Sequence, residues 1–419
     1  MKTYILLALV LLLIGCVEIQ KYELSNQAVL LTKSLPGSNL IAIDALVHDG
    51  LADESTPGIR NFIQTLLVKG TTKHNATELA LILDQIGSFG AATGEDHLEL
   101  QFKVPKENFE AALELLSEFL TEAIFPEEEI EKERVRILEA IKTQEDNPTE
   151  ALSNRLLEQL YPGHPYGRDA LGTKDSVQKI TREDLLQYYK THYTAPRLII
   201  SIVGSINASV KEQVETKLGG LPINEPVISP LPTPKPKLGK GTHLEKDITD
   251  NWIGIGYPAP KVTDSDRLSV AMLNSVLGGS MGARLFTNLR DKQGLAYSVG
   301  STYAPLESQG HLILYIGTHP HNQEKALKGL LLEAKKLREE PPDDEEFAQA
   351  LNKTLGNFML NHETVLDQAA YLARYEALGL GYEYDEKLPE ELKKVTPKDV
   401  QLAAQKYLKK GTAVIVGPR

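Results

Sequence analysis

The chain has 419 residues, of which 42% are hydrophobic and 24% are charged, as is usual for a globular protein. This length exceeds what a single hydrophobic core usually supports, so we expect two or more domains. The formal net charge of −12 argues against nucleic acid as the main partner, because contacts to phosphates need a basic surface.

The first residues, MKTYILLALVLLLIGC, predict an export signal over residues 1–16. One lysine precedes an apolar run, Tyr4 to Ile14, which is too short to span a bilayer comfortably and matches the hydrophobic part of a secretory signal. The run leads into Leu-Ile-Gly-Cys, which resembles a bacterial lipobox and predicts lipid attachment at Cys16. We therefore expect an exported, membrane-anchored lipoprotein that faces the periplasm. The alternative is an uncleaved signal anchor in which Cys16, the only cysteine, has no role.

The segment TPGIRNFIQTLLVKGT (Thr56–Thr71) predicts a helix with the spacing of a metal site but without its ligands. Asn61, Gln64 and Thr65 are related as i, i+3 and i+4, which places their side chains on one helical face. Zinc prefers imidazole nitrogen, thiolate sulfur or carboxylate oxygen, whereas these residues offer amides and a hydroxyl. The pattern thus indicates a metal-binding geometry filled with poor ligands.

Further along the chain, strand and helix patterns alternate. The segment His97–Val104 alternates apolar and polar residues, as a half-buried strand does, and His311–Thr318 predicts a second strand. A helical stripe between these segments consists of Phe109, Leu113, Leu116 and Leu120. The combination predicts α+β domains in which helices pack on an antiparallel or mixed sheet.

A proline-rich stretch divides the chain, and the two sides are alike. We predict a linker over residues 222–243, between an N-terminal domain (17–221) and a C-terminal domain (244–419). Thr181–Gly204 resembles Thr396–Gly417, since each is an N-capped helix followed by an apolar strand that ends in Val-Gly. The offset between the copies is about 215 residues, which indicates an internal duplication.

These motifs resemble the pitrilysin/insulinase family of metallopeptidases, in particular the two-domain branch of the processing-peptidase subunits. Family members read Gly-Leu-x-His-Phe-Leu-Glu-His-Met-Leu-Phe-Lys-Gly-Thr where this chain has GIRNFIQTLLVKGT. The inverted zinc motif His-x-x-Glu-His falls on Asn61, Gln64 and Thr65. In ERVRILEAI the family's third ligand, a glutamate, falls on Ala140. The resemblance implies a clamshell of two homologous domains. The replacement of the zinc ligands and of the general base predicts no metal or other cofactor in this chain.

The second domain keeps another family signature, LGGSMGARLFTNLRDKQGLAYSVGS, over residues 277–301. The resemblance implies that Arg290 and Tyr297 reach a zinc site and hold the substrate backbone and the charge that develops on its carbonyl. Arginine and tyrosine supply suitable hydrogen-bond donors for this task. The resemblance also implies that a glycine-rich loop lies near the substrate, through Gly278, Gly279 and Gly282. The alternative for the pair is a surface ion-pairing arginine and a core tyrosine.

The combination of a degenerate zinc motif and a retained Arg/Tyr motif predicts a non-catalytic subunit of a heteromeric zinc metallopeptidase. Such a subunit is inactive alone and lends Arg290 and Tyr297 to a homologous partner, where the zinc is expected, for cleavage of peptides or unfolded segments. One alternative is a non-enzymatic scaffold or binding module with the same clamshell fold. Another is a self-sufficient peptidase, which the four replaced positions oppose.

Lipid attachment can be tested by feeding a fatty-acid probe to a bacterial host that expresses the full chain. We predict that the wild type incorporates the probe and that Cys16→Ser does not, because the Leu-Ile-Gly-Cys frame presents this thiol for acylation. Labelling is measured after separation on a denaturing gel. Equal labelling of the two proteins would contradict the prediction.

Overall fold

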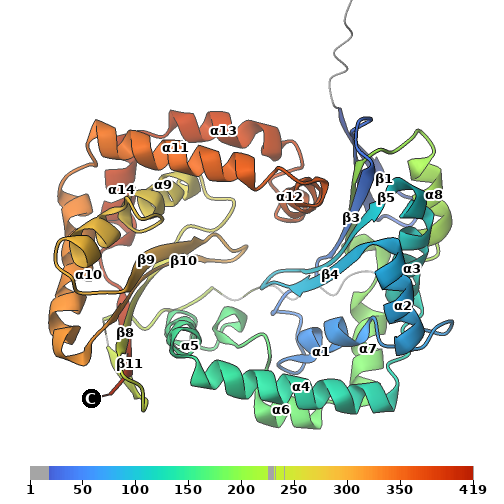
Figure 1. The fold of residues 1–419 in the computed structure, drawn as a ribbon, viewed down its shortest axis with the longest axis horizontal. Coiled ribbons are helices and arrows are strands. Elements are labelled where there is room, and N and C mark those ends of the chain that lie inside the picture. Colours follow the sequence, from blue (N-terminus) through green and yellow to red (C-terminus); the bar gives the residue numbers. More distant parts are fainter. Residues whose placement is uncertain (1–17, 225–230, 232, 240, 419) are drawn as a thin grey trace, which may run out of the picture.

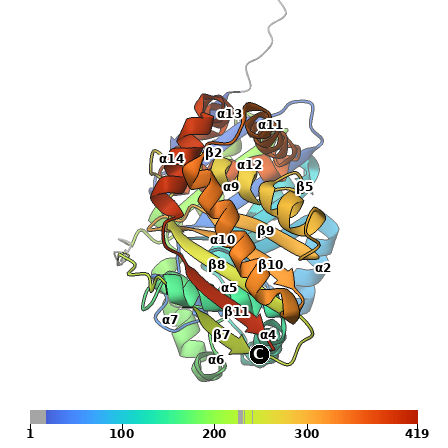
Figure 2. The same cartoon turned by 90° about the vertical axis from the view of Figure 1, so that its left-hand side faces the viewer.

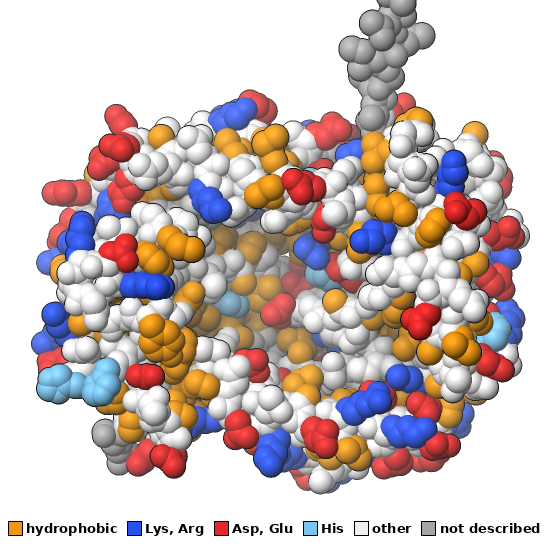
Figure 3. Space-filling view, viewed as in Figure 1, with side chains coloured by type: hydrophobic (Ala, Val, Ile, Leu, Met, Phe, Trp, Pro, Cys, Tyr) orange, Lys and Arg blue, Asp and Glu red, His pale blue; other side chains and the backbone are white. Residues whose placement is uncertain are grey.

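The computed structural model describes residues 18–224, 231, 233–239 and 241–418, so Cys16 lies outside the described residues. Two α+β halves stand on either side of a central opening (Figure 1), and the space-filling view shows that this opening leads into a hollow (Figure 3). The predicted class, α+β with two homologous domains, is confirmed. Within the described ranges, no helix has both the length and the apolar character needed to cross a membrane.

The first half contains a six-stranded mixed sheet in the spatial order β1-β2-β6-β3-β5-β4. Only β2 and β6 pair in parallel, and the remaining neighbours are antiparallel. The strands are β1 (Ile19–Glu23), β2 (Val29–Ser34), β3 (Leu40–Val47), β4 (Ser88–Thr93), β5 (Leu98–Pro105) and β6 (Leu198–Gly204). The helices are α1 (Ile59–Leu66), α2 (Ala76–Ile86), α3 (Phe109–Thr121), α4 (Glu127–Asp146), α5 (Pro148–Leu160), α6 (Lys174–Lys179), α7 (Arg182–His192) and α8 (Val210–Leu218).

The second half contains a five-stranded sheet in the order β7-β11-β8-β10-β9, in which only β7 and β11 are parallel. The strands are β7 (Thr242–Glu245), β8 (Asn251–Ala259), β9 (Ser298–Ala304), β10 (Gly310–Thr318) and β11 (Thr412–Gly417). The helices are α9 (Arg267–Leu277), α10 (Gln323–Glu339), α11 (Asp344–Leu360), α12 (Val365–Ala377), α13 (Tyr384–Lys394) and α14 (Pro397–Tyr407). Figure 2 shows α9, α10 and α14 in front of the sheet, on the side away from the opening. Strand β7, which pairs with β11, begins at Thr242, so the last two residues of the predicted linker (222–243) belong to the second sheet.

The predicted strands, helical stripe and duplication all appear in the structure. The apolar residues of β5 and of the stripe in α3 are buried in one core. The side chains of Thr181 and Thr396 each accept a hydrogen bond from the backbone N–H of an aspartate three residues later. The side chain of that aspartate accepts a hydrogen bond from the backbone N–H of the threonine. These capping boxes begin α7 and α14, which lead into the matching strands β6 and β11.

Two helices, α5 and α12, cross from one half to the other, and we call them the exchanged helices. Each lies on the sheet of the other half, on the inner face that is turned towards the central opening (Figure 1). Leu156 of α5 packs on β8 where Gly254 leaves room, because a Cβ atom there would lie 2.5 Å from a Leu156 methyl group. Ala369 and Leu372 of α12 are buried against the first sheet. Each sheet is therefore covered by a helix that the chain supplies from the opposite half.

A turn between β9 and β10 closes the seam between the halves. His48 contacts Glu307 with 2.9 Å between Nε2 and Oε1. The backbone N–H of Ser308 donates to the Tyr166 hydroxyl at 3.2 Å, and the Tyr161 hydroxyl donates to the Gln309 carbonyl at 2.8 Å. These polar contacts supplement the apolar contacts of the exchanged helices.

Beneath α12, the first sheet buries two carboxyl groups. Asp44 on β3 is fully buried, and Gln101 on β5 lies opposite it in the sheet. Burial, and then the nearby Glu99 carboxylate, raise the pKa of Asp44 well above its usual value. Burial opposes ionisation of Glu99, but His97 at 3.1 Å and Arg374 of α12 at 2.9 Å lower its pKa. The pKa values of the two groups are thus shifted in opposite directions, which favours a proton on Asp44 and a negative charge on Glu99.

We predict that Asp44→Asn stabilises the protein more at pH 8 than at pH 4. An unfolded aspartate ionises near pH 3.9, whereas the folded protein retains this proton to higher pH, so wild-type stability falls as the pH rises through this window. Asparagine does not ionise, and we expect its melting temperature at pH 8 to exceed that of the wild type by at least about 2 °C. Differential scanning calorimetry of the full chain measures the difference.

The matched control is Asp84→Asn, which alters an exposed aspartate on α2. It should leave the melting temperature nearly unchanged at both pH values, as exposed substitutions usually do. If Asp44→Asn raised the melting temperature equally at pH 4 and pH 8, removal of the ionisable carboxyl group would not be the cause of the increase.

Candidate functional site

Helix α1 carries the degenerate zinc motif, and its buried contacts hold it in place. Gly58 precedes the helix with a φ of 89°, and a Cβ atom there would lie 2.5 Å from the Leu171 carbonyl oxygen, so only glycine fits. Phe62 is fully buried, and Arg60, which is 1% exposed, forms an ion pair with Asp49 at 3.6 Å. The helix is therefore fixed by residues that do not belong to its polar face.

The polar face of α1 is half-buried, and two of its side chains already have partners within the fold. The Thr65 hydroxyl donates to the Phe62 carbonyl at 2.9 Å, and the Gln64 side-chain oxygen accepts a hydrogen bond from Thr93 of β4 at 3.0 Å. Ala140, the fourth position, is exposed on α4, which packs against α1. The local hydrogen bonds use groups that a metal site would need free.

The residues on this face do not fit zinc. A neutral amide, a neutral hydroxyl and a methyl group replace the nitrogen and carboxylate ligands that zinc requires. Across the described parts of the chain, no group of three or more His, Cys, Asp or Glu residues is placed to hold a metal ion. Gln64 also lacks a basic group that could accept a proton from an attacking water. The side chains of this face therefore do not support a metal-dependent step.

Tyr297 directly precedes β9, and the structure brings Arg290 next to it. Arg290 belongs to a π-helical turn, η4 (Phe286–Asp291), and its guanidinium lies 4.6 Å from the Phe286 ring centre. One guanidinium N–H donates to the backbone carbonyl of Tyr297 at 2.8 Å. This bond fixes the arginine beside the tyrosine while the arginine side chain remains exposed.

The Tyr297 side chain is 53% exposed, so it is not a core tyrosine. Its ring packs edge-on against Trp252 of β8, with 5.6 Å between the ring centres, and Gly317 of β10 leaves room for both rings. Partial burial and the charge of Asp250 raise the pKa of Tyr297, so its hydroxyl remains a neutral donor at physiological pH. The pair thus offers two kinds of hydrogen-bond donor at the edge of the second sheet.

The glycine-rich loop lies along the edge of β9. The Ser301 N–H donates to the Gly278 carbonyl at 3.2 Å, and a Cβ atom on Gly278 would lie only 2.5 Å from that nitrogen. Gly279 is also confined, because a Cβ atom there would lie 3.0 Å from Ser275 Cα. Gly282 is exposed and has open space around it, and Met281 beside it is 77% exposed. Close packing therefore explains Gly278 and Gly279, but not Gly282.

The predicted site residues form two groups, in opposite halves of the molecule. Asn61, Gln64, Thr65 and Ala140 lie on α1 and α4, whereas Arg290, Tyr297 and the glycine-rich loop lie along β9, across the central opening (Figure 1). Sequence analysis missed Trp252 and Asp250, which shape the surroundings of Tyr297, and Thr93, which binds Gln64. None of these three belongs to a recognisable motif, and only the packing of the elements reveals them.

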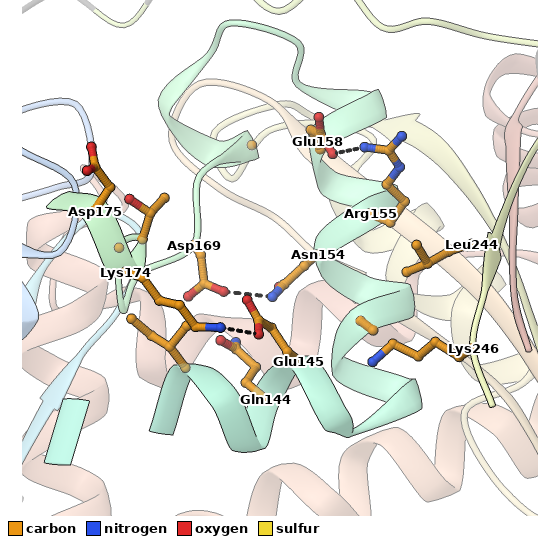
Figure 4. Close-up of a pocket in the computed structure, with 15 residues that line it drawn as sticks. Gln144, Glu145, Asn154, Arg155, Glu158, Asp169, Lys174, Asp175, Leu244 and Lys246 are labelled. Atoms are coloured by element: carbon orange, nitrogen blue, oxygen red, sulfur yellow. Dashed lines mark hydrogen bonds and ion pairs between the residues drawn. The ribbon is translucent and has the colours of Figure 1, made fainter. Parts of the chain in front are cut away.

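A wide pocket of about 870 Å³ lies apart from both groups, between α4, α5, the segment 167–175 and β7 (Figure 4). Two ion pairs lie in its lining, between Lys174 and Glu145 at 2.8 Å and between Arg155 and Glu158. Asn154 donates to Asp169 at 2.7 Å, and burial raises the pKa of this aspartate. The pocket contains none of the predicted site residues.

Two duplicated α+β domains around a hollow, with a motif of metallopeptidase type in each half, define a peptidase-like class of protein. The family description "Insulinase (Peptidase family M16)" matches residues 31–174, and "Peptidase M16 inactive domain" matches residues 179–354. The chain belongs to this M16 peptidase family.

Relatives and solved structures agree with this assignment. An uncharacterized zinc protease of Rickettsia felis is 28% identical and covers 94% of this chain and 97% of its own, and the uncharacterized zinc protease YmxG of Bacillus subtilis is 28% identical over 86% and 88%. The crystal structure of a peptidase M16 inactive domain from Pseudomonas fluorescens has a TM-score of 0.89, 22% identity and coverage of 96% and 98%. A protease from Helicobacter pylori has a TM-score of 0.88, 23% identity and coverage of 96% and 99%. The structural likeness concerns the fold.

We predict that the purified chain holds no stoichiometric zinc on the α1 face, because its side chains offer no strong ligand. Elemental analysis after dialysis measures the content of the wild type, of Gln64→Ala and of a control, Gln85→Ala, on the exposed surface of α2. All three should be equally poor in zinc. One tightly held zinc per wild-type chain that is lost only in Gln64→Ala would refute the prediction.

Proposed function

We propose that the chain is a non-catalytic subunit of a heteromeric zinc metallopeptidase. It would assemble with a homologous subunit that carries the zinc, and the substrate would be a peptide or an unfolded segment of a protein. The observation that carries the proposal is the contrast between the two motifs. On the α1 face, Gln64 and Thr65 form hydrogen bonds within the fold. Arg290 and Tyr297, in contrast, are held together by a hydrogen bond and remain exposed.

The geometry of the pair supports a role in binding a carbonyl group. Arg290 uses one guanidinium N–H for the Tyr297 backbone, so further N–H donors of the same fork stay available for a ligand. The Tyr297 hydroxyl is neutral and can donate one more hydrogen bond. Two fixed donors of this kind stabilise an oxygen on which negative charge develops. The partner would supply the metal and the general base, which the α1 face lacks.

The names of the relatives support a setting in proteolysis, since several are called zinc proteases. We further propose that the protein is exported and anchored through Cys16, with its folded part in the periplasm. This proposal rests on the sequence of residues 1–16, and β1 begins shortly afterwards at Ile19.

A non-enzymatic scaffold or binding module is the second candidate function. It is favoured by the structural tasks that some site residues already perform. Arg290 braces the backbone at the start of β9, and Gly278 allows close packing against the same strand. If Arg290 and Gly278 serve only to hold this part of the fold, substituting them should lower the stability of the protein and leave the rate of peptide cleavage unchanged.

We predict that Arg290→Ala and Tyr297→Phe each slow peptide cleavage by the co-expressed complex. Loss of one donor of this type costs about 10²–10³-fold in other enzymes, and we expect at least about tenfold at a partly exposed site. The double variant should lose less than the product of the two single effects if both groups hold the same carbonyl. Cleavage of an unstructured peptide is measured alongside gel filtration and zinc content, neither of which should change.

The matched control is Arg168→Ala, which removes an exposed arginine outside the motif and should leave the rate unchanged. Full activity of an assembled, zinc-loaded complex with both motif residues replaced would rule out the catalytic support role. That result would favour the scaffold.

A further inference from the structure

A second, smaller pocket opens on the inner face of the second sheet. It has a volume of about 390 Å³ and lies between the flank of α5 and strands β8, β9 and β10. Its apolar lining comes from Leu152, Leu156, Trp252, Ile313 and Tyr315. Its polar lining consists of hydroxyl groups, from Thr149, Ser153, Ser298 and Thr302. Among the described residues, no charged side chain lines it, although 24% of the chain is charged.

The pocket exists because α5 covers only part of the inner face. The helix packs mainly on β8 and β11 and reaches Ile313 of β10, whereas Thr302 of β9 stays exposed. Small residues deepen this part of the face. A Cβ atom on Gly300 would lie 2.7 Å from the Tyr315 hydroxyl oxygen, so the tyrosine lies flat over a glycine. The lining is fixed by packed strands and a packed helix, which gives a preformed site.

The internal duplication provides a comparison for this pocket. When HLELQFKV in β5 is aligned with HLILYIGT in β10, Glu99 is equivalent to Ile313 and Gln101 is equivalent to Tyr315. In the first half, Glu99 binds Arg374 of the exchanged helix α12 at 2.9 Å. At the corresponding place in the second half, the described residues form no ion pair, and Ile313 packs against the α5 leucines at the wall of the pocket. The same scaffold position is thus occupied by an ion pair in one half and is available to a ligand in the other.

The pocket lies beside Tyr297. Trp252 forms its wall and also packs edge-on against the Tyr297 ring, and Ser298 follows Tyr297 directly in the chain. A peptide whose carbonyl is held by the pair would therefore place a neighbouring side chain at the pocket mouth. A charged side chain would lose its hydration there without gaining a partner, which is costly, whereas an apolar one would gain burial.

We propose that this pocket binds a large uncharged side chain, aromatic or aliphatic, of an extended peptide held at Arg290 and Tyr297. The inference rests on the proposed function, because it names the substrate class for the same site. It assigns Trp252, Ile313 and Tyr315 as residues that determine specificity. It also predicts that the isolated chain recognises peptides without its partner.

Trp252 is the only tryptophan of the chain, so its fluorescence reports directly on the pocket. The probes are neutral peptides, acetyl-Gly-Ser-Gly-Xaa-Gly-Ser-Gly-amide, in which Xaa is Phe, Leu, Ala, Lys or Asp. We expect the Phe and Leu peptides to change the emission and to bind at least about tenfold more tightly than the Ala peptide. The Lys and Asp peptides should bind no better than the Ala peptide.

Thr302→Phe and Ser153→Leu fill the pocket from opposite sides, and neither residue is fully buried in the wild type. Each should reduce affinity for the Phe peptide by about tenfold or more. Thr216→Phe, on the exposed surface of α8, is the matched control and should bind like the wild type. Circular dichroism checks that every variant is folded.

Equal affinity for all five peptides, or undiminished binding of the Phe peptide by both folded pocket variants, would overturn the inference. The outcome is distinct from that of the cleavage assay. Selective binding by the isolated chain, together with full activity of the complex after loss of Arg290 and Tyr297, would retain the pocket and reject their catalytic support role. Equal binding of all five peptides, together with slowed cleavage after loss of Arg290 and Tyr297, would reject the pocket and retain their catalytic support role.

Discussion

The exchange of α5 and α12 is the constraint on which the rest of the structure depends. Leu152, Leu156 and Leu160 of α5 are buried in contacts with the second half, and Leu372 of α12 is buried against the first sheet. Burial of four such side chains contributes about 6–12 kcal/mol, which is comparable to the entire stability of a typical domain. Each sheet therefore depends on a helix of the other half to bury the apolar residues of its inner face.

This exchange explains why the site lies where it does. The exchanged helices cover the central strands of both inner faces and leave the outer strands β4 and β9 beside the hollow. The α1 face meets β4 through Thr93, and the Arg/Tyr pair lies at the start of β9. Both motifs thus lie at sheet edges beside the opening, where a long ligand has access. The hollow is a result of which strands the helices leave uncovered.

Much of the fold could be predicted from local patterns. Alternation along β5 and β10, the stripe of α3 and the capping boxes of α7 and α14 each depend on residues close together in the chain. The exchange could not be predicted in this way. Leu152, Leu156 and Leu160 have the spacing of a buried helical face, but this spacing does not identify the sheet that buries them.

The candidate site shows the same division. A motif identified Arg290 and Tyr297, yet Trp252 comes from a different strand and carries no motif, so its contact with the Tyr297 ring follows only from the pairing of β8, β10 and β9. The glycines of the loop looked alike in sequence. Their surroundings separate them, because Gly278 is enclosed by β9 and Gly282 faces open space.

The duplicated strands β5 and β10 have a consequence for how a ligand lies in the hollow. Their scaffold is nearly symmetric, but Glu99 with Arg374 makes one wall ionic, while Ile313 with Tyr315 makes the other apolar. An extended peptide has a direction, and a two-fold symmetric cradle would accept it equally well either way round. Once the two walls differ, the forward and reversed orientations have different energies. A duplicated fold can thereby distinguish the N-terminal from the C-terminal side of a bound chain.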